Sequence, residues 1–101
     1  MELCDLTVLP DDRPIPGDVV DAGPDPDPAA VERMVAAGGP VLVRLTGDGP
    51  GLLATAAVYA WLGVRVFRAP ATAAEELRQV LDMVASIRGE RPPALTRRGL
   101  A

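Results

Sequence analysis

The chain has 101 residues, enough for one domain, whereas a complete (β/α)8 barrel takes about 250 residues. Hydrophobic residues make up 49% and charged residues 24% of the sequence, a composition that excludes a disordered or fibrous protein. The net charge of -4 argues against nucleic-acid binding, because phosphate neutralisation requires a clustered basic surface.

The residue inventory limits the possible site chemistry. The sequence has no histidine, no lysine and a single cysteine, Cys4. These absences exclude a Ser-His-Asp triad, a zinc-histidine site, a P-loop and an internal disulfide, so we expect no metal and no cofactor. No signal sequence precedes Cys4, and the uncharged segment 49–64 is shorter than the about 20 residues that span a bilayer. We therefore expect a cytoplasmic protein without a membrane segment.

The first half of the sequence predicts two strands and one helix. Residues 3–9 alternate in the manner of a strand, and residues 18–22 (DVVDA) form a better strand candidate. The prolines of segment 11–17 indicate a surface connection between them. Pro28 can occupy the first turn of a helix, which the segment Gly38–Pro40 then ends.

The second half predicts two strand-helix units. Residues 40–45 (PVLVRL) form a continuous apolar strand typical of parallel sheets, and residues 52–62 form an apolar helix without a wide polar face. Such a helix is expected to be deeply buried or to pack against another subunit. Residues 64–68 (VRVFR) predict a fourth strand, and residues 75–88 an amphipathic helix that a T-x-x-E capping box at Thr72 introduces.

From residue 18 onward the predicted order is β-α-β-α-β-α with short connections, which requires parallel strands and right-handed crossovers. We predict an α/β fold of about four strands and three helices, either a partial (β/α) barrel or a small parallel-sheet sandwich. A barrel fragment has open sheet edges, so a partner is expected to cover them. Residues 1–90 form the single predicted domain, and residues 91–101 a loosely ordered tail.

The run from Gly51 to Arg88 reads GLLATAAVYAWLG, VRVFRAP and TAAEELRQVLDMVASIR. It resembles the C-terminal end of dihydropteroate synthase, the pterin-binding barrel enzyme of folate synthesis. In that family the C-terminal helices form the homodimer contact, so the resemblance implies an interface on the helices 52–62 and 75–88. The residues expected there are Leu52, Leu53, Ala56, Tyr59, Ala60, Leu81 and Val84.

The same resemblance implies candidate site residues at the carboxyl ends of the strands. In VVDAGPDPDP, Asp21 and Gly23 match the family's Asp-Pro-Gly-x-Gly-Phe motif, whose aspartate hydrogen-bonds the pterin ring. In PVLVRLTGD, Thr46 stands near the family's serine, Arg44 replaces a glycine and the lysine is lost. In FRAPAT, Arg68 matches the anion-binding arginine of Arg-x-His-Asp-Val, without the histidine or aspartate. The resemblance thus implies pterin or anion binding at Asp21, Gly23, Thr46 and Arg68, and no catalytic residue.

These residues also have structural interpretations. Asp21 can cap the turn before the first helix, and Arg68 can form an ion pair with Asp21 or Asp48. A diphosphate leaving group needs several donors at once, for which one arginine is a partial substitute.

The leading hypothesis is a catalytically degenerate dihydropteroate synthase-like protein that acts through homo- or hetero-oligomeric association. One alternative is a pterin-binding subunit whose site is completed by a partner chain. If this complex is active, it is a pterin-dependent transferase. The other alternative is a structural or regulatory subunit with no small ligand.

Overall fold

The structure is a computed structural model that describes residues 6–89. One sheet of parallel strands has the order β1-β4-β3-β2, with β1 (Thr7–Leu9), β2 (Val20–Pro24), β3 (Val41–Arg44) and β4 (Val66–Arg68). The helices are α1 (Pro28–Ala36), α2 (Gly49–Leu62) and α3 (Ala74–Ile87), with the short 3-10 helix η1 (Ala71–Ala73) before α3. The predicted tail 91–101 and the first residues of the first predicted strand lie outside the described residues.

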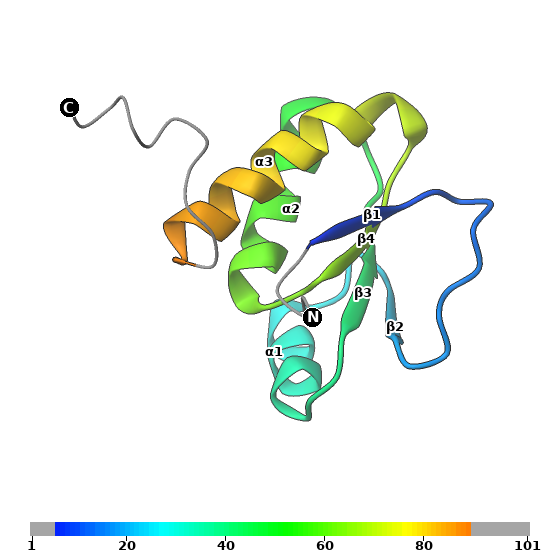
Figure 1. The fold of residues 1–101 in the computed structure, drawn as a ribbon, viewed down its shortest axis with the longest axis vertical. Helices are drawn as coiled ribbons and strands as arrows, with labels where there is room; N and C mark the ends of the chain where they lie inside the picture. The colour runs from blue at the N-terminus through cyan, green and yellow to red at the C-terminus, as the bar shows by residue number, and fades with distance from the viewer. Residues whose placement is uncertain (1–5, 90–101) are drawn as a thin grey trace.

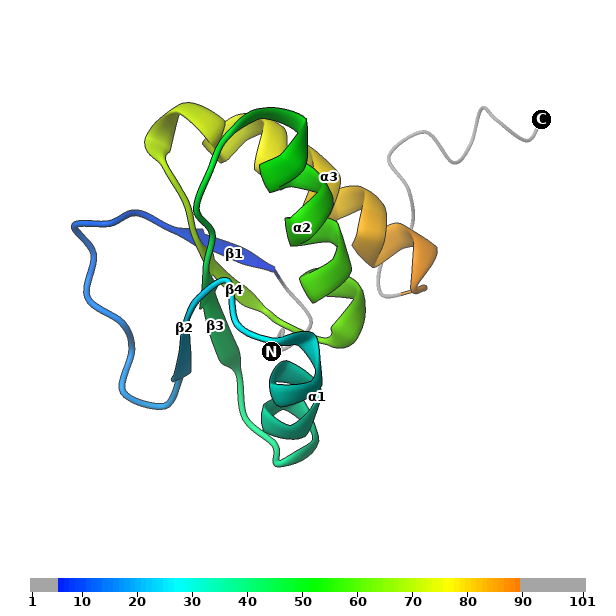
Figure 2. The same ribbon diagram turned by 180° about the vertical axis from the view of Figure 1, so that it is seen from behind.

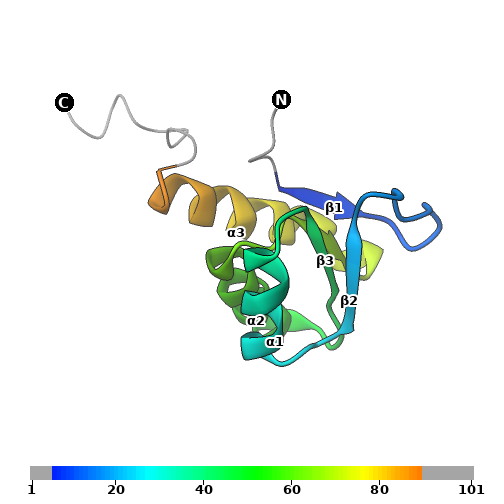
Figure 3. The same ribbon diagram turned by 90° about the horizontal axis from the view of Figure 1, so that it is seen from below.

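All three α-helices lie on one face of the sheet (Figure 1, Figure 3). The strands β2, β3 and β4 are added in one direction across the sheet, and right-handed crossovers then place α1 and α2 on the same face. A doubly wound sandwich would carry helices on both faces. The predicted α/β fold is therefore confirmed, and its arrangement is that of a partial barrel.

The strand β1 pairs with β4 rather than with β2, the next strand in the chain. Its register places Val8 opposite Phe67 and Leu9 opposite Arg68. In a closed barrel the first strand also lies beside the last one. The chain therefore brings its N-terminal strand to the edge that a complete barrel would close.

The main hydrophobic core lies between the sheet and the helices. Val43 of β3 and Phe67 of β4 point into it and are fully buried, as is Leu77 of α3. Apart from Phe67 and Tyr59, the buried side chains of this cluster are aliphatic. Small aliphatic residues pack at short distances, which lets short helices cover a short sheet closely.

The opposite face of the sheet is covered by the connection between β1 and β2, residues 10–19, here called the β1–β2 loop (Figure 2). Three strands contribute to a second, smaller buried cluster: Leu9, Leu42 and Val66. Ile15 and Val19 of the loop pack against this cluster. In a complete barrel this face would meet side chains from the other strands. Here the loop takes over part of that covering role.

Several predicted boundaries shift in the structure. The strand predicted at 18–22 is found two residues later, and α2 begins at Gly49 rather than at residue 52. The predicted capping box is wrong: Thr72 lies inside η1, and the N-cap residue of α3 is Ala73, which makes no side-chain cap. Among residues 6–89, no helix combines the length and hydrophobicity needed to cross a membrane.

Candidate functional site

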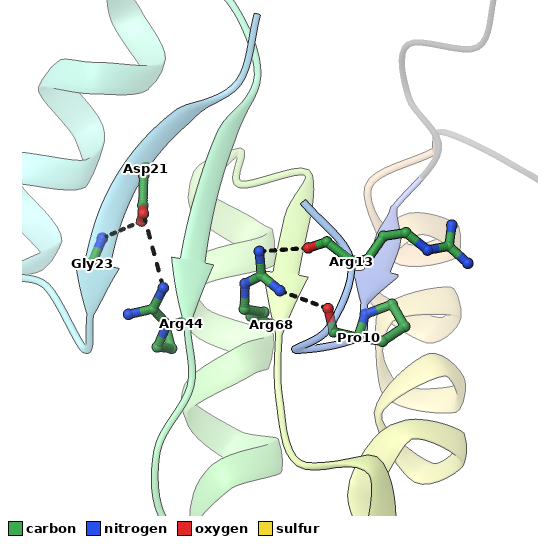
Figure 4. Close-up of polar contacts among 6 residues, drawn as sticks. All are labelled: Pro10, Arg13, Asp21, Gly23, Arg44 and Arg68. Carbon is green, nitrogen blue, oxygen red and sulfur yellow. Dashed lines mark hydrogen bonds and ion pairs between the residues drawn. The ribbon is translucent and has the colours of Figure 1, made fainter. Parts of the chain in front are cut away.

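The candidate ligand residues lie on three neighbouring strands of the sheet. Asp21 and Gly23 belong to β2, Arg44 ends β3 and Arg68 ends β4. Arg44 and Arg68 are register partners, so both side chains project from the face opposite the helices. Figure 4 shows Asp21, Arg44 and Arg68 in a row across this face.

Arg68 is a buried arginine, with only 6% of its surface exposed. Its Nη1 donates a hydrogen bond of 2.6 Å to the carbonyl oxygen of Pro10, and its Nη2 donates one of 2.9 Å to that of Arg13 (Figure 4). Its Nε is buried and has no partner among the described residues. The guanidinium thus holds the start of the β1–β2 loop against the sheet. The predicted ion pair of Arg68 with Asp21 or Asp48 is wrong, because within residues 6–89 its partners are these carbonyl groups.

Asp21 makes local contacts. Its Oδ1 accepts a 2.9 Å hydrogen bond from the backbone N–H of Gly23, a local bond within β2 where the register with β3 shifts between Asp21 and Pro24. Its Oδ2 lies 4.0 Å from Nη2 of Arg44, and both side chains are about two-fifths exposed. An exposed ion pair of this kind contributes at most about 1 kcal/mol. Arg44 therefore takes the acidic partner that was predicted for Arg68.

Thr46 lies outside this row and joins two loops. Its hydroxyl donates a hydrogen bond to Oδ2 of Asp25, which links the loop after β3 to the loop after β2. On the same loop, the carbonyl oxygen of Pro26 accepts a hydrogen bond from the hydroxyl of Tyr59 in α2. The sequence did not predict this network, since its partners are 21 and 33 residues apart in the chain and one acceptor is a backbone carbonyl group. Its geometry fixes the entry into α1.

The phenol of Tyr59 is expected to titrate at high pH. Burial raises the pKa of Tyr59 above its ordinary value of 10.0, and the carboxylates of Asp25 and Asp27 raise it further. Since this pKa is higher in the folded than in the unfolded chain, the stabilisation by the neutral phenol is complete below about pH 10 and is lost as the pH rises through the folded-state pKa.

Tyr59 is the only tyrosine of the sequence, so tyrosinate absorbance against pH reports this group alone. We expect the titration midpoint of Tyr59 to lie at a higher pH in the native chain than in the same chain unfolded in urea. The double substitution of Asp25 and Asp27 by asparagine should move the native midpoint part of the way down. Equal midpoints in the native and unfolded chains would contradict the burial of the phenol.

The residues predicted at an interface lie mostly in the chain's own core. Six of them are buried: Leu52, Ala56, Tyr59, Ala60, Leu81 and Val84. Leu53 is half-buried and packs against the same core. Other side chains are exposed on the outer sides of these helices, namely Val58 and Trp61 of α2 and Met83 and Ile87 of α3. A contact made by the outer sides of α2 and α3 would use this second set.

Within residues 6–89, no group of three or more cysteine, aspartate or glutamate side chains is arranged to hold a metal ion. The row of Asp21, Arg44 and Arg68 itself offers two guanidinium groups and one carboxylate.

No protein-family model matches the chain. It is 44% identical over 85 residues to inactive dihydropteroate synthase 2 of Mycobacterium leprae, covering 70% of this chain and 28% of that protein. It is 52% identical over 59 residues to inactive dihydropteroate synthase 2 of Mycobacterium tuberculosis H37Rv, covering 58% and 18% of the two chains.

The solved structure of Mycobacterium tuberculosis Rv1207 is similar, with a TM-score of 0.56 and 45% identity over 66% of this chain and 28% of that one. The chain spans less than a third of the length of these relatives. Over the matched residues, the chain is a homologue of the dihydropteroate synthase-like proteins.

Proposed function

We propose that this chain is a dihydropteroate synthase-like protein that lacks synthase activity and acts by associating through the outer sides of α2 and α3. The observation that carries the first part is the bonding of Arg68. Both terminal nitrogens of the arginine that matches the family's anion-binding position donate to carbonyl groups of the chain's own loop. A bound diphosphate would have to compete with these two bonds, and the sequence has no histidine or lysine to assist. The relatives named inactive dihydropteroate synthase 2 support the same conclusion.

The second part is supported by exposed apolar side chains on the two packed helices. Four such side chains are 52 to 66% exposed, namely Val58 and Trp61 of α2 and Met83 and Ile87 of α3, and the two helices pack against each other. Arg88 lies 5.7 Å from the centre of the Trp61 ring and donates a 2.6 Å hydrogen bond to the Trp61 carbonyl oxygen. Tryptophan and arginine dominate the energetics of many protein interfaces. The resemblance to a family whose C-terminal helices dimerise favours a second copy of this chain as the partner.

The association is tested by sedimentation velocity or light scattering at micromolar concentration. We expect a dimer, and we expect Trp61→Glu to weaken dimerisation at least tenfold, because a charge would be placed in the apolar contact. Val20→Glu is the matched control, since Val20 is 45% exposed but lies on β2, away from both helices. A monomeric unmodified chain, or equal effects of the two substitutions, would contradict the proposed surface.

A ligand-binding role is the second candidate, favoured by the row of Asp21, Arg44 and Arg68 on one face. In this role Asp21 would bind the pterin ring and the arginines its anion, with a partner chain completing the site. Titration calorimetry with hydroxymethyl-pterin diphosphate separates the candidates. A heat of binding that Asp21→Ala abolishes would support pterin binding. If the chain gives no heat of binding, either alone or with a partner, the structural or associative role is left.

A further inference from the structure

A cavity of about 420 Å³ opens at the carboxyl ends of β1 and β4, beside the start of α3. Its volume lies in the range of about 300 to 1,000 Å³ typical of small-molecule sites. The apolar part of its wall consists of Val8, Pro10, Ala69, Ala71 and Ala74, and its charged part of Asp11, Asp12 and Arg78. None of the residues in the Asp21–Arg68 row lines it, so it is separate from the candidate site described above.

The charged groups of this cavity have no partner in the described part of the chain. Among residues 6–89, Asp11, Asp12 and Arg78 form no hydrogen bond or ion pair through their side chains. Charges of both signs thus face one space without neutralising each other. All three side chains are exposed and solvated by water, so a bound molecule that carries both charges would exchange these water contacts for ion pairs.

The wall that carries the two carboxylates is fixed in position. The carbonyl oxygen of Pro10 accepts hydrogen bonds from Arg68 and, at 3.0 Å, from the backbone N–H of Arg13, which closes a turn around Asp11 and Asp12. Because the loop is held before any ligand arrives, little ordering entropy remains to be lost on binding. The opposite wall is the regular backbone of η1 and α3, which carries Arg78.

We propose that this cavity binds a small zwitterion with an apolar body, of the class of aliphatic amino acids. The ammonium group is held by Asp11 and Asp12, the carboxylate by Arg78, and the aliphatic part lies against Val8 and the alanines. Charge-assisted hydrogen bonds of this kind are short and about twice as strong as neutral ones. This site does not depend on dimerisation or on the bonding of Arg68 to an external anion.

The test uses NMR titration of the whole chain with three probes that share one aliphatic body: L-leucine, 3-methylbutylamine and 4-methylpentanoate. Leucine carries both charges, whereas the amine and the acid carry one each. We expect leucine to bind at least tenfold more tightly than either single-charge probe, since each lost charge-assisted hydrogen bond costs about a factor of ten. Failure of leucine to bind, or equal affinities of the three probes, overturns the proposal.

Substitutions then assign the two ends of the ligand. Arg78→Gln should weaken leucine about tenfold and leave the amine unchanged, whereas the double variant Asp11→Asn, Asp12→Asn should weaken leucine and the amine. Arg33→Gln and Asp18→Asn are matched controls, because both residues are exposed and neither lines the cavity. Loss of leucine binding in the controls, or its retention in both cavity variants, overturns the assignment.

Discussion

Arg68→Met is expected to lower the free energy of unfolding by about 3 kcal/mol, because two charge-assisted hydrogen bonds worth about 1.5 to 3 kcal/mol each are lost. Methionine recovers part of this loss, since it removes the cost of burying a guanidinium that is only 6% exposed. The carbonyl groups of Pro10 and Arg13 nevertheless lose their donor, and the β1–β2 loop loses its attachment to β4. Ile15 would then be free to leave the cluster that it covers.

Urea denaturation at fixed protein concentration measures this effect, with the fluorescence of Trp61, the only tryptophan, as the signal. Arg44→Met is the matched control: Arg44 is the register partner of Arg68 on the same face, but it is 44% exposed in its 4.0 Å ion pair. We expect the control to change stability by less than about 1 kcal/mol. Arg68→Lys should give an intermediate loss, since one ammonium group cannot reproduce the two-pronged geometry. Equal losses for the two methionine variants would contradict a structural role for Arg68.

This arginine also marks the limit of the sequence-based prediction. The strand pattern placed Arg68 correctly at the carboxyl end of β4. Its partners are backbone carbonyl groups 58 and 55 residues earlier in the chain. Every residue has a carbonyl group, so no side-chain pattern distinguishes Pro10 and Arg13 as acceptors. The predicted ion pair was wrong because charge complementarity is visible in a sequence, whereas the path of a loop is not.

In the sheet, too, the local elements were predictable from the sequence and their tertiary arrangement was not. The alternation of short strands and helices was predictable, since each element has its own periodicity and its own proline or glycine boundary. The position of β1 beside β4 was not, because strand order depends on which edges meet in space. The solvent-facing side of α2 could not be predicted either. The sequence of this helix is apolar all round, so only the packing distinguishes buried Ala56 from exposed Val58.

The glycine that ends α2 gives the second large expected effect. Gly63→Ala should lower the free energy of unfolding by about 3 kcal/mol, combining backbone strain of about 1 to 3 kcal/mol with overpacking of similar size. Gly63 has a φ of 115°, which non-glycine residues rarely adopt. A Cβ at this position would lie 2.8 Å from Cγ1 of Val35, a residue of α1. The turn from α2 into β4 therefore depends on the absence of a side chain.

A matched control separates the two contributions. Gly38 follows α1 with a φ of 96°, but a Cβ there would have no neighbour within 4 Å, so Gly38→Ala should cost only the strain. Adding Val35→Ala to Gly63→Ala removes the crowding methyl groups, and we expect a favourable coupling energy of about 1 to 2 kcal/mol in the double-mutant cycle. Equal losses for the two glycine variants, together with zero coupling to Val35, would mean that α1 does not press against the end of α2. The close approach of these two helices would then have no part in the stability of the fold.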